Sequence, residues 1–263
     1  TLDTLGVDYI EGGWPGANPV DSAWFDSKPK LRATFTAFGM TKRAGHSAEN
    51  DTALNAVVNA NTAAVCLVGK THDFHVETAL GIALDENIEN ITRSIEHLVS
   101  QGREALFDAE HFFDGYKANP DYARACIQAA FEAGARWIVL CDTNGGALPA
   151  EVGQIVQEVI AAGLPGDHLG IHTHNDTENA VANTLAAIDA GARQIQGTLN
   201  GLGERCGNAN LTSLLPILKL KEPYRSHYEI GITDEALRDL KRASRVLDDI
   251  LNRIPAPQAA FVG

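Results

Sequence analysis

Residues 169–176 read LGIHTHND and carry two histidines, His172 and His174, at alternating positions. The chain has nine histidines, and only here does a single residue separate two of them. Side chains at alternating positions of a β-strand point to the same side, so two imidazoles at a strand end can bind one metal ion at about 2.0–2.2 Å. The alternative is a solvated strand end, and the pair alone leaves both interpretations open.

Oxygen-bearing side chains elsewhere in the sequence favour the metal site. Asn208, Glu204 and Glu110 could complete a site with two histidine ligands, and such a donor set suits Mn²⁺, Mg²⁺, Co²⁺ or Zn²⁺. Glu110 is also a candidate general acid or base, with a carboxylate at the start of a helix as the alternative. Thr143 is a candidate hydrogen-bond donor to a substrate carboxylate, with strand-end capping as the alternative. Lys70 is either an attractant for an anion or a solvated side chain.

These residues follow apolar runs that recur along the chain. In each unit a helix ends at a glycine, a short apolar run follows, and the run ends in polar or glycine-rich residues; Ala-Gly-Ala-Arg occurs in two units, at 133–136 and 190–193. The runs predict seven strands, at 7–11, 32–38, 63–69, 104–109, 136–141, 168–173 and 194–199. Amphipathic helices are predicted between them, the longest over 85–101.

Strands that alternate with helices predict a parallel sheet with right-handed crossovers. Units of about 30 residues without a GxGxxG motif favour an α/β fold of the (β/α)₈ TIM-barrel type over a doubly wound sheet. Active sites of such barrels lie at the C-terminal ends of the strands, where the candidate residues fall. Because seven strands are readable, we expect the first strand before Thr1.

The domain organisation follows from the same pattern. We predict that residues 1–224 form the catalytic barrel without strand one. Residues 225–263, with one charged helix over 234–252, are expected to be the truncated start of a post-barrel helical linker or subdomain.

The composition limits the function classes. A formal net charge of −13 argues against nucleic-acid binding, and neither a membrane-spanning stretch nor a signal-peptide pattern is present. The four cysteines are far apart, without a CxxC pair, which favours a reducing cytoplasm over a disulfide framework.

Several motifs together are similar to one known family. GIHTHND, GTLNGLGERCGNANL, FDAEHF and CDTNGG resemble the metal-dependent acyl-CoA synthases and lyases of the isopropylmalate synthase superfamily, which includes homocitrate synthase and HMG-CoA lyase. YIEGGWPGANP and DAEHFFDGYKANP are similar to its (R)-citramalate synthase branch, and this similarity extends over nearly all of residues 1–224.

The resemblance implies a divalent-metal site whose ligands are His172, His174 and Asn208. In the family a fourth ligand, an Asp, and a substrate-binding Arg come from a D-x-T-L-R-D-G segment on strand one. This sequence contains no such segment, and we expect it before Thr1. The family's catalytic His beyond the barrel and its C-terminal inhibitor-binding domain are likewise expected outside the sequence.

The resemblance also implies the reaction, a Claisen-type condensation of acetyl-CoA with a 2-oxo acid in branched-chain amino-acid biosynthesis. The branch similarity indicates pyruvate as the acid and citramalate as the product. Glu110 matches a catalytic glutamate near the acyl-CoA methyl group, Thr143 matches a threonine that holds the 2-oxo acid carboxylate, and Glu204 lies beside the metal as a substrate-binding residue. Family members usually form homodimers, which we expect here.

Three alternatives stay open. A 2-isopropylmalate or homocitrate synthase would differ mainly in the pocket for the 2-oxo acid. An HMG-CoA-lyase-like lyase or an aldolase would use a similar barrel and the same histidine pair. A non-catalytic barrel would keep the fold without turnover.

Overall fold

The computed structural model describes residues 1–27 and 29–263. Within them, parallel strands form one sheet whose order follows the chain, β1-β2-β3-β4-β5-β6-β7. The strands are β1 Tyr9–Glu11, β2 Thr34–Met40, β3 Ala64–Lys70, β4 Glu104–Glu110, β5 Trp137–Asp142, β6 Leu169–Thr173 and β7 Gln194–Gln196. The predicted seven-stranded parallel sheet is therefore confirmed.

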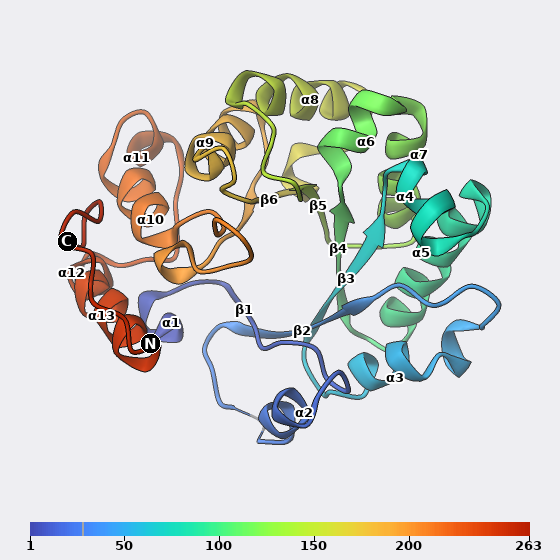
Figure 1. The fold of residues 1–263 in the computed structure, drawn as a ribbon, viewed down its shortest axis with the longest axis horizontal. Helices are drawn as coiled ribbons and strands as arrows, with labels where there is room; N and C mark the ends of the chain where they lie inside the picture. Colours follow the sequence, from blue (N-terminus) through green and yellow to red (C-terminus); the bar gives the residue numbers. More distant parts are fainter. Residues whose placement is uncertain (28) are drawn as a thin grey trace.

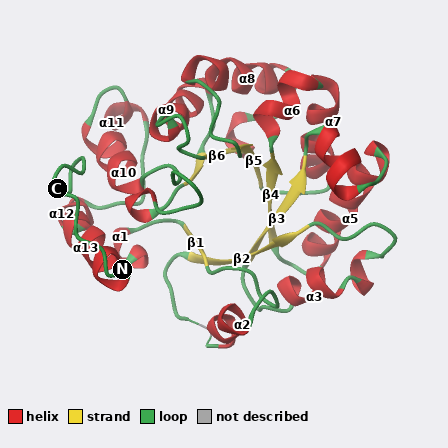
Figure 2. Cartoon of the chain, viewed as in Figure 1, coloured by secondary structure: helices red, strands yellow, loops and turns green. Residues whose placement is uncertain are grey.

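Helices surround the curled sheet, which lies at the centre of the molecule (Figures 1 and 2). The α-helices are α1 Leu2–Leu5, α2 Pro19–Asp26, α3 Thr52–Val58, α4 Asp73–His75, α5 Leu84–Ser100, α6 Phe112–Ala118, α7 Pro120–Glu132, α8 Pro149–Ala161, α9 Ala180–Ala190, α10 Leu211–Leu220, α11 Tyr224–His227, α12 Asp234–Arg238 and α13 Leu240–Ile250. Four short turns of other helix types are η1 Ala48–Asn50, η2 Val76–Leu80, η3 Gly166–His168 and η4 Leu199–Gly201.

Alternation along the strands separates two apolar layers. Residues on the outer face, such as Leu67 and Phe107, pack with Ile91 and Ile95 of α5 in the main core. The intervening residues point inward and form a smaller cluster composed of Ala64, Cys66, Leu106, Trp137, Val139 and Cys141. This cluster separates the polar side chains at the carboxyl ends of the strands from the pair of Tyr9 and Glu104 at the amino ends.

Three strands depart from the predicted bounds by two residues or more. β1 begins at residue 9 instead of 7, β7 ends at 196 instead of 199, and β2 runs over 34–40 instead of 32–38. The backbone N–H groups of Arg32 and Ala33 donate to the carboxylate of Asp3, at 2.8 Å each, which removes them from the ladder. At the other end, Gly39 and Met40 continue the pairing with β3.

The two edge strands leave the sheet open over the described residues. There β1 pairs with β2 alone and β7 with β6 alone. The sheet is thus an incomplete (β/α)₈ barrel, as predicted. A strand before Thr1 stays a prediction.

The single helix predicted over 234–252 is wrong, because the structure has two helices, α12 and α13. The N–H of Asp239 donates to the carbonyls of Ala236 (3.1 Å) and Glu235 (3.2 Å), and the shorter-range bond tightens the turn between them. The segment packs against the N-terminus in a cluster of Leu5, Leu199, Leu240, Ala243 and Val262, so both termini lie on one side of the molecule (Figure 1). The domain boundary at 224 stays a prediction.

Among the described residues, no helix is both long enough and apolar enough to cross a membrane. The cytoplasmic location stays a prediction.

Candidate active site

The histidine pair converges at the carboxyl end of β6. His172 lies within the strand and His174 directly after it, so both side chains point to the inside of the barrel. Their Nε2 atoms are 3.2 Å apart and their ring centroids 5.1 Å apart. The alternating spacing therefore does bring two imidazole nitrogens to one point.

The loop after β7 adds the amide of Asn208. A backbone bridge joins Asn208 to His174, and the amide nitrogen of Asn208 is 3.0 Å from Nε2 of His172. The nitrogen and oxygen of such an amide are interchangeable by rotation, so the same position can present Oδ1. A Cβ atom at Gly203 would lie 1.5 Å from Oδ1 of Asn208, so only glycine leaves space for this amide.

This arrangement fits a divalent ion. Two nitrogens 3.2 Å apart both reach an ion at about 2.1 Å when the N–metal–N angle is roughly 100°. Burial lowers the pKa of His174 to about 4, and His172 nearby adds to this effect. The imidazole of His174 is therefore neutral near pH 7, which is the form that binds metals.

The donor set of the described residues is nevertheless partial. Within residues 1–27 and 29–263, no group of three or more His, Cys, Asp or Glu side chains is arranged to hold a metal ion. The third donor that the structure brings to the histidines is the amide of Asn208. The roles of His172, His174 and Asn208 as ligands stay predictions.

Two side chains behind the histidines are additions that the sequence pattern does not single out. Nδ1 of His172 is 2.8 Å from Oε1 of Gln196, and Nε2 of Gln196 donates to Oδ1 of Asp108 at 2.7 Å. Asp108 is 5 % exposed, and burial raises the pKa of its carboxyl while His172 lowers it. Because Asp108 lies on β4 and Gln196 on β7, they are brought together only by the curl of the sheet.

Glu110 occupies the carboxyl end of β4, two residues after Asp108 and on the same inner face. Its Oε2 is 2.6 Å from Nζ of Lys70, the residue opposite it at the end of β3. Both side chains are less than one quarter exposed. The sequence suggested that Lys70 either attracts an anion or points to solvent. In the structure it instead pairs with the candidate base Glu110.

Thr143 directly follows β5, and its side chain contacts the backbone of His111, which directly follows β4. Its Oγ1 accepts a hydrogen bond from the backbone N–H of His111 at 2.8 Å, which leaves the hydroxyl proton free for another acceptor. Its carbonyl accepts from Arg205 at 2.7 Å, and Arg205 also binds Asp176 at 2.7 and 3.0 Å. Arg205 thus ties together the loops that follow β5, β6 and β7.

Glu204 is the exposed one among the predicted site residues, although its negative charge acts on His174 and opposes the lowering of the His174 pKa. Its side chain is 79 % exposed and lies 3.6 Å from Arg205. Its assignment to substrate binding stays a prediction.

Three more histidines lie near Glu110. The ring centroids of His72 and His75 are 5.0 Å apart, and those of His75 and His111 are 4.1 Å apart. His111 has a left-handed backbone (φ 58°). Burial, together with the nearby His75, lowers the pKa of His111 to about 4, whereas Glu110 and Asp114 oppose this effect.

Acid should therefore destabilise the protein partly through His111. Between its folded pKa of about 4 and its ordinary value of 6.5, the unfolded chain binds more protons, so the free energy of unfolding falls as the pH drops through this window. His111→Asn keeps a residue that tolerates the left-handed backbone. Between pH 7 and 5.5, the free energy of unfolding of the variant, measured by urea unfolding, should fall by about 0.5–1 kcal/mol less than that of the parent. Equal losses in the two proteins would contradict this, and between pH 7.5 and 8.5 their curves should run parallel.

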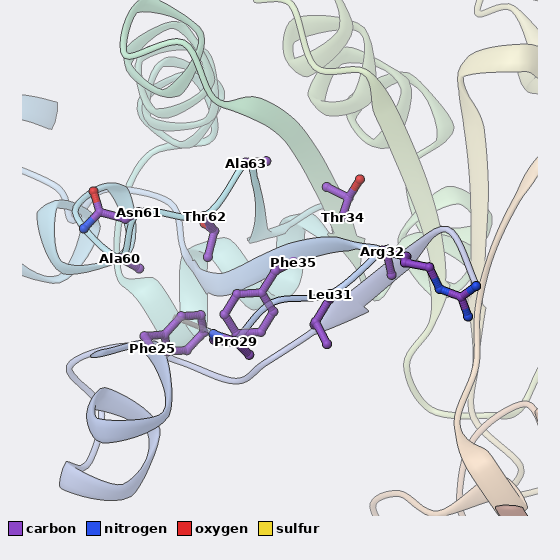
Figure 3. A pocket seen from close by; sticks show the side chains of 11 residues that line it. Phe25, Pro29, Leu31, Arg32, Thr34, Phe35, Ala60, Asn61, Thr62 and Ala63 are labelled. Atoms are coloured by element: carbon purple, nitrogen blue, oxygen red, sulfur yellow. The ribbon is translucent and has the colours of Figure 1, made fainter. Parts of the chain in front are cut away.

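One cavity lies away from all these residues. It has a volume of about 390 Å³ and is lined by Phe25, Phe35 and Ala60 among others (Figure 3). Its walls include Thr34, the first residue of β2, and Ala63, which precedes β3. The cavity is therefore at the amino ends of the strands, opposite the candidate site.

Comparison with known proteins assigns the chain to a family. The HMGL-like family matches residues 1–243 of the chain. The chain is 50 % identical to an (R)-citramalate synthase from Geobacter sulfurreducens and 47 % identical to one from Synechocystis sp., and each match covers 100 % of this chain and 49 % of the relative. A 2-isopropylmalate synthase from Caulobacter vibrioides is 33 % identical, over 95 % of this chain and 46 % of that protein. The chain spans about half the length of these curated relatives.

Among solved structures, an HMG-CoA lyase from Acinetobacter baumannii in complex with coenzyme A and 3-methylmalate has a TM-score of 0.78 to this chain. The match covers 100 % of this chain and 85 % of that one, at 22 % identity. At that identity the likeness concerns the fold, and it agrees with an incomplete barrel.

Proposed function

Because the chain belongs to the HMGL-like family, we propose that its protein is an acyltransferase that condenses acetyl-CoA with a 2-oxo acid. We propose pyruvate as the acid and citramalate as the product. The observation that carries the proposal is the convergence of His172, His174 and Asn208 at the end of the barrel that also holds Glu110 and Thr143.

The choice of pyruvate is supported by the relatives. Those named (R)-citramalate synthase are 47 and 50 % identical to the chain, against 33 % for the 2-isopropylmalate synthase. The ligands of the structurally similar lyase, coenzyme A and 3-methylmalate, are of the same chemical kinds as the thioester and the hydroxy acid in the proposed reaction.

A divalent ion held by His172, His174 and Asn208 would act as a Lewis acid toward the keto group of the 2-oxo acid. Thr143 would orient that acid by donating a hydrogen bond from its hydroxyl group to the carboxylate of the acid. The two contributions fix the acid at both of its polar ends.

Glu110 would act as the base. Its carboxylate takes a proton from the methyl carbon of acetyl-CoA, and the electron pair left on that carbon attacks the keto carbon of pyruvate and forms the new C–C bond. The π bond of the keto group breaks, and its electron pair goes to the oxygen, which takes up a proton and becomes the hydroxyl group of the product. Lys70 holds the carboxylate in place by its 2.6 Å contact. Water then cleaves the thioester, and coenzyme A leaves as the free thiol, which makes the overall reaction irreversible.

The proposal is tested by incubating the full-length protein with acetyl-CoA, Mn²⁺ and a panel of 2-oxo acids while free thiol is followed. We expect the highest kcat/KM with pyruvate and lower values with 2-oxoisovalerate and 2-oxoglutarate. A preference for either of those acids would identify an isopropylmalate or a homocitrate synthase instead. If none of the 2-oxo acids leads to thiol release and the protein instead cleaves a 3-hydroxyacyl-CoA, it is a lyase.

The role of Thr143 gives a separate prediction. Thr143→Val removes a hydrogen bond to a charged carboxylate, worth about 1.5–3 kcal/mol, so KM for pyruvate should rise roughly 10- to 100-fold. KM for acetyl-CoA should change little. Thr143→Ser keeps the hydroxyl and is the matched control, with KM near that of the parent. Equal KM values for the Val and Ser variants would exclude the proposed contact.

A further inference from the structure

A chain of three side chains links the inner face of β4 to the histidine pair. Oδ1 of Asp108 accepts from Nε2 of Gln196 at 2.7 Å, and Oε1 of Gln196 lies 2.8 Å from Nδ1 of His172. The three residues come from β4, β7 and β6. A carboxyl group, an amide and an imidazole are thus arranged in a line that ends at the proposed metal position.

The orientation of the Gln196 amide is set by residues of β3 and β4. Its nitrogen faces two acceptors, Oδ1 of Asp108 and, at 3.9 Å, Sγ of Cys66. Because Oδ1 of Asp108 accepts from Gln196 and Sγ of Cys66 lies on the same side, Gln196 directs its N–H groups toward Asp108 and its carbonyl toward His172.

Nδ1 of His172 therefore faces an oxygen that can only accept, and must itself carry a proton. A neutral imidazole has one N–H, so Nε2 of His172 is left with its lone pair. The other side of the ring agrees. Nε2 faces Nε2 of His174 at 3.2 Å, which can donate to it, and the Asn208 amide at 3.0 Å, which donates in the orientation that presents its nitrogen.

His174 lacks such a partner. Its Nδ1 is buried and has no hydrogen-bond partner among the described residues. Of the two histidines, only His172 has its tautomer determined by the surrounding side chains.

We propose that Asp108 and Gln196 are positioning residues that hold His172 in the Nδ1–H tautomer and keep its Nε2 ready to bind the metal ion. The inference rests on the proposed metal site but not on the reaction. Partners of this kind orient a ligand ring and typically contribute about 10- to 100-fold to metal affinity.

The first test reads the tautomer directly in the metal-free, full-length protein. Long-range ¹H–¹⁵N spectra of histidine-labelled protein distinguish a protonated from an unprotonated ring nitrogen, and the His172 signals are assigned by their loss in His172→Gln. We expect Nδ1–H in the parent and a shift toward Nε2–H in Gln196→Met. An Nε2–H form in the parent would overturn the proposal.

The second test measures Mn²⁺ and Co²⁺ affinity by calorimetry. Gln196→Met should weaken binding about 10- to 100-fold. Gln194→Met is the matched control, because Gln194 lies two residues earlier on the same strand and its Oε1 has no hydrogen-bond partner among the described residues. It should leave tautomer and affinity unchanged. Unchanged values in Gln196→Met, or equal losses in both variants, would refute the role.

A second substitution tests the proposal if Gln196→Met does not fold. Asp108→Leu removes the acceptor that orients Gln196 and should give a mixture of His172 tautomers in folded protein, whereas an unaltered tautomer would refute the proposal. Neither readout involves turnover. A parent protein that has the expected tautomer and metal affinity but does not catalyse the condensation would therefore contradict the proposed function and leave the role of Asp108 and Gln196 standing.

Discussion

His172→Ala is expected to abolish metal retention and to lower turnover by more than about 100-fold, which is the upper range for the loss of a mere supporting partner. The reason is geometric, since Nε2 of His172 lies within 3.2 Å of both His174 and the Asn208 amide and is the atom these groups share. Metal content per chain, measured by mass spectrometry after gel filtration, checks the first part, and thiol release checks the second.

The fold of this variant should be preserved, because His172 is at the mouth of the barrel and not among the buried apolar residues that hold the sheet to its helices. His227→Ala removes an exposed histidine far along the chain and is the control. Stoichiometric metal in His172→Ala would contradict the proposed ligand. A large drop in thermal stability of the metal-free parent would show that metal and fold are not separable.

Glu110→Gln should lower kcat by about 10²- to 10⁴-fold, the usual contribution of a positioned base. Glutamine keeps the size of the side chain but cannot take up the methyl proton. Metal affinity should not change, because the nearest group that Glu110 contacts is Lys70 and not a histidine. In this variant, exchange of the acetyl-CoA methyl protons with deuterated solvent should be lost as well as turnover. The exchange is measured in the presence of a non-reacting 2-oxo acid analogue.

Glu104→Gln is a matched control for this experiment. Glu104 begins the same strand that Glu110 ends, and its carboxylate pairs with the hydroxyl of Tyr9 at the opposite end of the barrel. We expect kcat within about twofold of the parent, which is less than 0.5 kcal/mol. Parent-like methyl exchange in Glu110→Gln would assign the base to another residue.

The fold was predictable because local patterns specify it. Apolar runs of about strand length that end in polar residues located all seven strands. The spacing of Ile88, Ile91, Ile95 and Leu98 located α5, in which Ile88 is half-buried and the other three side chains are fully buried. The His172–His174 convergence was predictable for the same reason, since a period of two is a property of any strand.

Contacts between distant strands were not predictable in this way. Asp108 and Gln196 are 88 residues apart, and whether they meet depends on the registers of the strands between β4 and β7. Lys70 and Glu110 face each other only because β3 and β4 pair in that register. The start of β2 was missed because the carboxylate of Asp3 takes up two backbone N–H groups, which no local pattern records.

Gly203 has a consequence for how this loop can evolve. Its φ lies outside the left-handed region, so the restriction comes from Asn208, whose side-chain Oδ1 and Cγ would lie 1.5 and 2.7 Å from an added Cβ atom. The two positions are thus coupled through space. Related proteins that have lost the amide should be free to vary at the position of Gly203, whereas those that retain it should keep glycine. Joint variation at these two positions would therefore separate relatives that keep this donor from those that have abandoned it.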